Sequence, residues 1–454
     1  MKIVSFCGIS GSGMSALAQV LKAKGYEVRG SDRSFDQCKD LKNKKALESL
    51  GIKIFKQDGS AIDKDTDFLY VSTAIEESIA DVKKAIDLGV QIKKRSDLLN
   101  EIFSSYSYGI AVGGTSGKTT LTAMIGYILD KADKKPTVIN GGILKDYENQ
   151  KGIANVILND GDIAVIEADE SDGSIEKYTP YIGIVNNITI DHKPIDELKK
   201  LFHDFVCRAK FGIVNLDCEN SKELLSLKNV KTFSISNKNA DVYLHHITPL
   251  KDGVSYQLKD KIFKLKLIGA FNVSNAAAAI LATSILGVDM FEAAKILQNF
   301  SGTRRRLDVV AQKNGITFID DFAHNPDKVN ASMSALEEYD GRIIVMFQPH
   351  GFSPMRMMGK QIIESFSKTF KKEDILFMPE IFYTGGSVNK DISSKDLIDY
   401  AQSLGLNAHF FENREQIKNE IIKMAQKGDR IVIMGARDNS LTDFCKSISE
   451  EISC

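Results

Sequence analysis

The sequence predicts an α/β protein of three domains, each built around a largely parallel β-sheet. Short apolar runs alternate with amphipathic, helix-like stretches along most of the chain, which is the pattern of βαβ units. Polar residues gather directly after many apolar runs, at the predicted carboxyl ends of strands, where open α/β sheets bind ligands. The length of 454 residues agrees with three domains of about 150 residues each.

The first predicted domain covers residues 1–105 and is expected to be Rossmann-like. A short strand, a glycine turn, a helix and a second strand ending at Asp32 make one βαβ unit, and a later strand over 68–75 contains Ser72. The turn GISGSG (8–13) places backbone N–H groups at a helix start, which suits a diphosphate. Its spacing is G-x-x-G-x-G, whereas a dinucleotide-binding turn has G-x-G-x-x-G.

The second predicted domain covers residues 106–299 and is expected to be a P-loop domain with a parallel sheet. The stretch GGTSGKTT (113–120) lies between an apolar strand and a helix and contains G-x-x-G-K-T. Glycines in such a loop let backbone N–H groups approach phosphate oxygens, while Lys118 pairs with the β- and γ-phosphates and Thr119 offers a hydroxyl to Mg²⁺. The strand tip EADESD (167–172) supplies carboxylates, which Mg²⁺ prefers.

Further polar clusters follow other predicted strands. His192, next to Asp191, is interpreted as a second Mg²⁺ ligand or a phosphate contact. In the third predicted domain (300–454), also expected to be Rossmann-like, the arginine run 304–306 suits phosphate or a developing anion. The stretch DDFAHNPD (320–327) suits a ribose, Mg²⁺ or an amine.

The composition argues against several classes of protein. The formal net charge is −1, which gives no overall attraction to nucleic acid or anionic membranes. No apolar run reaches the ~18 residues of a membrane span, and the N-terminus does not read as a secretory signal. The six cysteines contain no CxxC pair, so no zinc site is expected. We expect a cytoplasmic protein with small-molecule partners only.

Taken in order, these motifs resemble those of the Mur ligase family of peptidoglycan synthesis. The segment GISGSGMSALA…VRGSD is similar to the family's UDP-binding segment, GTSGKTT to its ATP loop, and EADESD is a particularly specific match. The stretches GAFNVSNAAAA (269–279), RRRLD (304–308), DDFAHNPD and FQPH (347–350) follow where the family has them. The resemblance therefore covers most of the chain.

The resemblance implies an activity. The first domain is expected to bind a UDP-sugar, the second ATP, and the third an amino acid or another amine. ATP would phosphorylate the carboxylate of UDP-N-acetylmuramate, with Mg²⁺, and L-alanine would attack the acyl phosphate to form an amide. The alternative within the family is attachment of a muropeptide or another amine in cell-wall recycling. A monomer or homodimer is expected.

The resemblance also implies roles for individual residues. The expected catalytic residues are Lys118, Glu167, His192, Arg305 and Asp321; the expected Mg²⁺ ligands are Thr119, Glu167 and His192, with Glu170 as a neighbour. The expected ATP contacts are Gly114, Thr115, Ser116, Gly117, Lys118, Thr119, Thr120, Asn272, Asn275, Arg305 and Asp321. The expected substrate contacts are Gly11, Ser12, Gly13, Met14, Ser15, Asp32, Ser72, His324, His350 and Arg356.

The chain departs from the family's pattern at several positions. Alanine-adding members usually have histidine where this chain has Ser116, Phe271 and Asn325. After FQPH they continue with an arginine and a Thr-Arg pair, whereas this chain has Gly351 and no arginine before Arg356. The segment MGARDNSL also differs from the usual GAGD ending. Because the third domain selects the amine, these changes bear on the amine more than on the ligase chemistry.

Two other classes of function remain as alternatives at this stage. An NAD-dependent oxidoreductase would rest on the first glycine turn, but it leaves the ATP loop and EADESD unexplained. A sensing protein would bind UDP-sugar and nucleotide without ligating them, but the retained Lys118 and Glu167 argue against it.

Overall fold

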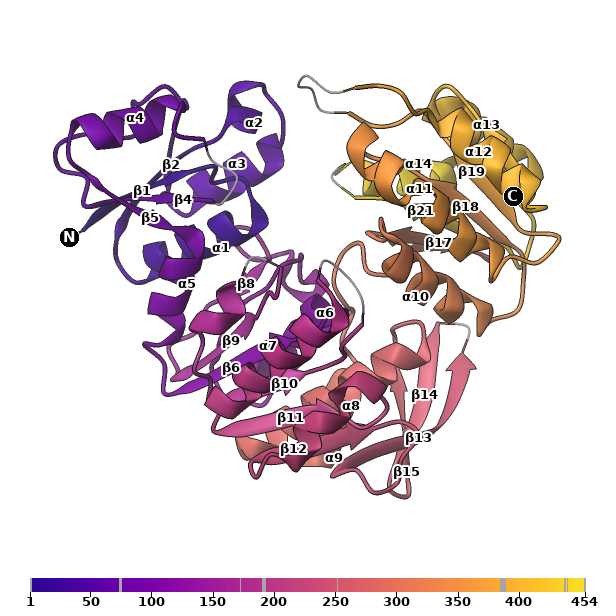
Figure 1. The fold of residues 1–454 in the computed structure, drawn as a ribbon, viewed down its shortest axis with the longest axis horizontal. Coiled ribbons are helices and arrows are strands. Elements are labelled where there is room, and N and C mark those ends of the chain that lie inside the picture. Colours follow the sequence, from indigo (N-terminus) through magenta and orange to yellow (C-terminus); the bar gives the residue numbers. More distant parts are fainter. Residues whose placement is uncertain are drawn as a thin grey trace. The chain divides into compact units, whose positions relative to one another are not determined.

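The computed structural model describes residues 2–72, 76–171, 173–189, 193–250, 252–383, 389–436, 438 and 440–452 (Figure 1). It is an α/β structure with three sheets, as the sequence predicts. No helix among these residues is long and apolar enough to cross a membrane. The chain divides into two compact units, the first made of Met1–His245, Gln257–Phe263 and Ser274–Thr303, and the second of His246–Tyr256, Lys264–Val273 and Arg304–Cys454.

The first sheet lies in the first unit and has five parallel strands. They are β1 (Ile3–Cys7), β2 (Glu27–Ser31), β3 (Lys53–Phe55), β4 (Phe68–Val71) and β5 (Gln91–Lys94), with helices α1 (Ser12–Ala23), α2 (Arg33–Asp36), α3 (Leu41–Ser49), α4 (Ala80–Asp87) and α5 (Arg95–Phe103). The strand order is β3-β2-β1-β4-β5, all in parallel pairs. The order reverses between β1 and β4, and a ligand crevice forms at the carboxyl ends of strands at such a point. The glycine turn leaves β1 there.

The second sheet contains ten strands and carries the phosphate loop near its middle. Its strands are β6 (Tyr108–Gly113), β7 (Thr137–Ile139), β8 (Val156–Ile157), β9 (Ile163–Glu167), β10 (Ile182–Val185), β11 (Phe211–Asn215), β12 (Val230–Ser234), β13 (Val242–Leu250), β14 (Gly253–Leu258) and β15 (Lys261–Leu265). The order is β15-β14-β13-β12-β11-β10-β6-β9-β7-β8. β6 pairs in parallel with β9 on one side and with β10 on the other. The ends of these three strands therefore meet at one edge.

The helices of this part of the chain are α6 (Lys118–Lys131), α7 (Ile195–Arg208), α8 (Ala270–Ile285) and α9 (Met290–Leu297); α6 and α7 contact that sheet directly, and α9 packs on α6. Three short 3₁₀ segments, at Lys145–Tyr147, Ser174–Lys177 and Glu219–Ser226, lie in connections between strands. α8 buries four consecutive alanines, Ala276 to Ala279, completely. Alanine has the highest helix propensity and lets neighbouring elements approach closely, so this segment forms a helix that is buried all round.

The third sheet lies in the second unit and has a core on both faces. Its strands are β16 (Asp308–Lys313), β17 (Ile316–Asp321), β18 (Ile343–Phe347), β19 (Ile375–Met378), β20 (Ala408–Phe410) and β21 (Arg430–Met434), in the order β16-β17-β21-β18-β19-β20. Only β16 pairs antiparallel; the other registers are parallel. Alternate residues of β18 point to opposite faces: Val345 belongs to one apolar cluster and Ile344 to the other.

Helices cover both faces of this third sheet. α10 (Pro326–Glu337), α11 (Phe352–Ser367) and α12 (Ser394–Ser403) contribute to one cluster, and α13 (Arg414–Met424) and α14 (Leu441–Glu451) to the other. Local signals fix their starts. Asn325 caps α10 by accepting the backbone N–H of Lys328, and Ser393 forms a capping box with Asp396 at α12.

The predicted domain boundaries remain predictions. The first sheet ends at Lys94 and the second begins at Tyr108, while the second ends at Leu265 and the third begins at Asp308. Residues 240–268 contain the strands β13, β14 and β15. The sequence analysis did not identify β20, which is short and has an exposed central residue.

The first residue of β14, in the second unit, gives a first testable prediction. Gly253 has a φ of 150°, and a Cβ there would lie 2.0 Å from the carbonyl oxygen of Leu265. We expect Gly253→Ala to destabilise the fold by about 3 kcal/mol, because strain and overpacking add. Gly405 has a φ of 84° but no atom within 4 Å of its Cβ position, so Gly405→Ala should cost only about 1 kcal/mol. Thermal unfolding midpoints compare them; equal shifts would contradict the prediction.

Candidate functional site

The phosphate loop connects β6 to α6 and has a backbone that requires glycine. Gly114 and Gly117 have φ angles of 126° and 83°. A Cβ at Gly117 would lie 2.6 Å from Nδ2 of Asn186 and 3.0 Å from Oδ1 of Asn275. The chain therefore passes directly over these two amides, and any larger residue at position 117 would displace them.

Three asparagines hold the loop from below. Asn187 Oδ1 accepts hydrogen bonds from the Ser116 backbone N–H (2.8 Å) and the Thr115 hydroxyl (2.8 Å). Asn186 Nδ2 donates to the Ser116 carbonyl oxygen (3.0 Å) and to Asn275 Oδ1 (2.9 Å). The loop is thus bound to the tip of β10 and to α8. This places Asn275, a predicted ATP contact, under the phosphate loop.

Lys118 is paired within the loop region. Its ammonium donates to the Gly114 carbonyl oxygen (2.7 Å) and to Glu170 Oε2 (2.6 Å). The exposed fractions of the two side chains are 14% and 4%, so this is a largely buried ion pair. Lys118 also lies near Asp169: burial would raise the pKa of that carboxyl, but Lys118 and Ser171 outweigh burial and hold the pKa below its usual value. The ammonium is therefore surrounded by negative charge.

The predicted metal ligands Thr119 and Glu167 lie together. The Thr119 hydroxyl donates to Glu167 Oε2 (3.1 Å), and the Gly141 backbone N–H donates to Glu167 Oε1 (2.6 Å). Asn140 has a buried side-chain oxygen that has no hydrogen-bond partner among the residues that the structure describes. A Cβ at Gly142 would lie 3.9 Å from the Asn140 amide nitrogen and 3.0 Å from Cγ2 of Thr119, so both side chains border the same glycine.

This set of donors fits Mg²⁺. A carboxylate, a hydroxyl and an unpaired amide oxygen beside a phosphate loop are hard oxygen ligands, and Mg²⁺ usually takes its remaining ligands from water and phosphate. No cluster of three or more histidine, cysteine or carboxylate side chains occurs among the described residues. His192, its neighbour Asp191, and Asp172 of EADESD lie outside the described residues, so the proposed second ligand is not placed.

The glycine turn of the first domain enters α1, whose first turn contains the predicted contacts Ser12 to Ser15. The carboxylate of Asp32 holds the glycine turn in place, because it accepts hydrogen bonds from the Ser10 and Ser34 backbone N–H groups (both 2.9 Å). Ser72 directly follows β4, at the same sheet edge. Sequence analysis missed Arg95, whose Cδ and Nη1 lie 3.0 and 3.3 Å from the Cβ position of Gly13. A guanidinium beside this turn suits a diphosphate.

Arg305 and Asp321 point into the interior of the third sheet's domain. Arg305 is 8% exposed; its Nε donates to Asp320 Oδ1 (3.3 Å) and its Nη2 to the Gly435 carbonyl oxygen (2.5 Å). Asp321 accepts from the Leu307 backbone N–H (3.2 Å) and from the Ser332 hydroxyl. Burial raises the pKa of both Asp320 and Asp321. In this conformation both predicted ATP contacts are engaged within their own domain.

The predicted amine-binding residues are only partly brought together. The rings of His324 and His350 meet edge to face, with centroids 5.4 Å apart. Burial lowers the pKa of His324 to about 3, reinforced by the positive charge of Lys328. His324 Nδ1 lies 2.8 Å from the Phe322 carbonyl oxygen, so that nitrogen carries the proton and donates. Arg356 pairs instead with Asp391 and the Asn389 carbonyl oxygen on the surface.

Arg414 is a further residue that sequence analysis missed. Its guanidinium donates to Gln348 Oε1 (2.7 Å), to the Ser440 hydroxyl (3.0 Å) and to the carboxylate of Asp438. Gln348 follows β18 and Asp438 follows β21, so Arg414 ties together the carboxyl ends of two adjacent strands. The polar residues after β18 and β21 could have indicated a cluster at these strand ends. Arg414 could not be identified in this way, because it begins α13 in a stretch without a motif.

Asn272, another predicted ATP contact, lies in the first turn of α8. Its amide donates to the Ile268 carbonyl oxygen (2.8 Å) at the start of α8. This contact fixes the turn that precedes the helix.

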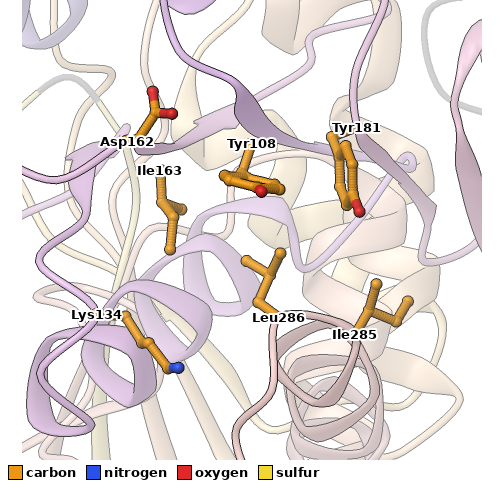
Figure 2. Close-up of a pocket in the computed structure, with 7 residues that line it drawn as sticks. All are labelled: Tyr108, Lys134, Asp162, Ile163, Tyr181, Ile285 and Leu286. Carbon is orange, nitrogen blue, oxygen red and sulfur yellow. The ribbon is translucent and has the colours of Figure 1, made fainter.

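A cavity of about 440 Å³ lies elsewhere in the first unit. Figure 2 shows Tyr108 and Tyr181 side by side above Leu286, with Lys134 and Asp162 at its rim. Tyr108 and Ile163 are the first residues of β6 and β9. The cavity is therefore at the amino ends of these strands, opposite the phosphate loop, and it is not the catalytic site.

Three protein-family models match consecutive segments that contain most of the chain. The Mur ligase family, catalytic domain, matches residues 3–107; the Mur ligase middle domain matches 112–283; and the Mur ligase, glutamate ligase domain, matches 305–437. The phosphate loop, Glu167 and Asn275 all lie in the middle match.

Individual relatives match over nearly the full chain. A UDP-N-acetylmuramate–L-alanine ligase of Sulfurihydrogenibium sp. is 34% identical, covering 99% of this chain and 98% of the relative, and one of Persephonella marina is 34% identical over 98% and 96%. The crystal structure of a UDP-N-acetylmuramate–alanine ligase from Thermotoga maritima aligns with a TM-score of 0.80 at 25% identity, covering 99% and 98%. A murein peptide ligase from Psychrobacter arcticus shares the fold (TM-score 0.68, 22% identity, full coverage of both chains).

The low pKa of His324 predicts a pH effect on stability. An unfolded histidine binds a proton below about pH 6.5, but folded His324 does not until about pH 3, so stability is lost as the pH falls through this window. We expect the thermal unfolding midpoint to fall less between pH 7 and pH 5 in His324→Gln than in the wild type. His409→Gln, at an exposed position on β20, should keep the wild-type pH dependence. A wild-type slope in His324→Gln would contradict the assignment.

Proposed function

Because the chain belongs to the Mur ligase family, we propose that it joins the carboxylate of UDP-N-acetylmuramate to L-alanine at the expense of ATP, in peptidoglycan synthesis. The observation that carries the proposal is the shared edge of β6, β9 and β10, where Lys118 and Thr119 at the end of the glycine loop contact Glu170 and Glu167 at the end of β9. Full-length relatives that carry this ligase name support the choice of substrates.

The chemistry follows from the weakness of a carboxylate as an electrophile. Transfer of the γ-phosphoryl group from ATP to the carboxylate oxygen gives an acyl phosphate and ADP. The amine nitrogen then attacks the acyl carbon, a C–N bond forms, and the C–O bond to inorganic phosphate breaks. Negative charge gathers on the phosphoryl oxygens, and Lys118 is placed at the loop to stabilise it.

We assign roles to the candidate residues within this scheme. Thr119 and Glu167, with His192, would hold Mg²⁺, which would supply charge neutralisation on the phosphates. The first turn of α1 (Gly11 to Ser15), with Ser72 and Arg95, would receive the UDP diphosphate, and the carboxylate of Asp32 would accept hydrogen bonds from hydroxyl groups of the UDP-sugar. His324, His350 and Arg356 would receive the amine, and Arg305 and Asp321 would act from the third domain. The functional boundaries we propose are 1–105, 106–299 and 300–454.

The amine and the cellular setting are the finer parts of the proposal. L-alanine is favoured by the relatives, and a muropeptide or another amine is the alternative within the same chemistry. Nucleotide substrates and Mg²⁺ imply a cytoplasmic location. One chain carries all the proposed residues, which suits a monomer or homodimer.

Phosphate release tests the proposal directly. The wild type is incubated with ATP, Mg²⁺ and UDP-N-acetylmuramate, and each amine from alanine to muropeptides is added in turn. We expect release that requires both the UDP-sugar and alanine. Release only with a peptide would replace alanine as the substrate, and no release with any amine would reject the ligase activity.

A loop variant tests the site itself. We expect Lys118→Ala to lower kcat by about 100-fold or more, because it removes the cation at the transferred phosphoryl group. Binding of the UDP-sugar, measured by calorimetry, should be retained. Lys131→Ala lies on the last turn of the same helix and should leave kcat unchanged. Near-normal turnover of Lys118→Ala would show that the loop does not serve the reaction.

A further inference from the structure

A buried polar contact joins the first and second sheets' domains within the first unit. Ser12, Ser15 and Gln19 lie at i, i+3 and i+7 on α1 and therefore share one helix face. That face packs beside β7 and β8, as Figure 1 shows for α1 and β8. The segment that meets it is Ile153 to Asn155, just before β8.

The two amide side chains in this contact are fully hydrogen-bonded. Gln19 Oε1 accepts from the Ile153 backbone N–H (2.9 Å), and its Nε2 donates to the Ile153 carbonyl oxygen (3.2 Å) and to Asn155 Oδ1 (2.9 Å). Asn155 Nδ2 donates to the Ser12 carbonyl oxygen (2.8 Å) and to the Ser15 hydroxyl (3.1 Å). Gln19 and Asn155 are each 1% exposed. Satisfied polar networks of this kind are rigid and directional.

The contact is too close to allow another register. Gly152 has a φ of 89°, and a Cβ there would lie 2.3 Å from Oε1 of Gln19. The backbone of the second domain thus comes into direct contact with the α1 side chain. A slide of α1 along this segment would break the paired hydrogen bonds of Gln19 with Ile153.

The same network continues to the candidate metal site. The Asn155 carbonyl oxygen accepts from the Asn140 backbone N–H (2.9 Å). The next N–H, of Gly141, donates to Glu167 Oε1 (2.6 Å), and Glu167 Oε2 accepts from Thr119 (3.1 Å). Three hydrogen bonds therefore lead from the start of α1, at the glycine turn, to the carboxylate beside the phosphate loop.

We propose that Asn155, together with Gln19, is a positioning residue that fixes the α1 turn relative to Glu167. It touches neither the reacting carboxylate nor the phosphates in this scheme. It sets the distance between the domain that holds the UDP-sugar and the loop that holds the transferred phosphoryl group. A shift of about 1 Å between reacting groups lowers rates by roughly 100-fold, so such a fixed spacing matters for kcat.

The network also couples the two ligands. A UDP-sugar at the turn and a nucleotide at the loop each bind at one end of the same hydrogen-bonded segment. Because the segment is rigid, a nucleotide that fixes Glu167 also fixes the α1 turn, so the second ligand binds more tightly. This inference rests on the proposed function, but the coupling is measurable by binding alone.

The test replaces both amides with apolar side chains of similar shape, as Gln19→Met with Asn155→Leu. Replacing both side chains leaves neither side-chain amide without its partner, but the Ile153 backbone N–H loses its acceptor, so a thermal unfolding midpoint first establishes that the variant is folded. We expect kcat to fall about 10- to 100-fold, while the Kd of an ATP analogue measured alone stays at its wild-type value. A non-hydrolysable ATP analogue with Mg²⁺ should tighten UDP-N-acetylmuramate binding about 5-fold or more in the wild type and not in the variant.

Lys177→Gln is the matched control, because Lys177 also bonds from the second domain to the first. Its ammonium donates to Ser96 (3.0 Å) and Asp97 (2.5 Å) on α5. We expect near wild-type kcat and coupling. Wild-type kcat and coupling in the double variant, or an equal loss in Lys177→Gln, would overturn the inference. If the wild type binds both ligands but releases no phosphate, the proposed activity fails, and the coupling measurement still decides the inference.

Discussion

The buried ion pair between Lys118 and Glu170 is the contact on which the arrangement of the phosphate loop depends. Both charges are largely removed from water, and the Gly114 carbonyl oxygen supplies a second acceptor for the ammonium. Removing one member of such a pair leaves an unpaired buried charge, which destabilises far more than the pair stabilises. Glu170 therefore keeps the lysine at the loop.

The loop around this pair is held ready by neutral amides rather than by charges. Asn186 and Asn187 bind the Ser116 peptide from one side, and Asn275 completes the set. These neutral hydrogen bonds add no charge to the loop, so the charges that face the phosphate position are those of Lys118 and its partner Glu170. A loop whose donors are already held in place is what electrostatic stabilisation of a phosphoryl transfer requires.

The sequence predicted contacts between residues near the ends of neighbouring strands. It did not predict contacts between segments that lie far apart in the chain and carry no motif. Thr119 and Glu167 could be paired because Thr119 follows the loop after one apolar strand, Glu167 ends another, and these strands, β6 and β9, are neighbours. Gln19 and Asn155 lie 136 positions apart in stretches without a motif. The sequence could not show which arginine of the run Arg304 to Arg306 turns inward. Arg305 does so: it has a φ of 60° and turns towards Asp320, and no periodicity indicates this turn.

The departures from the family pattern can be weighed against these contacts. The loop amides grip Ser116 through its backbone N–H and carbonyl oxygen, so serine in place of histidine leaves the loop's support intact. Asn325 accepts the Lys328 N–H at the start of α10, and asparagine is among the best helix caps, so this replacement has a local structural use. Phe271 is 39% exposed at the first turn of α8. None of the three substitutions touches the Lys118–Glu170 ion pair or the Thr119–Glu167 contact. They alter the surroundings of the ligands, while the phosphoryl-transfer framework is retained. The chemistry therefore follows from the site, whereas the amine must be identified by a binding experiment.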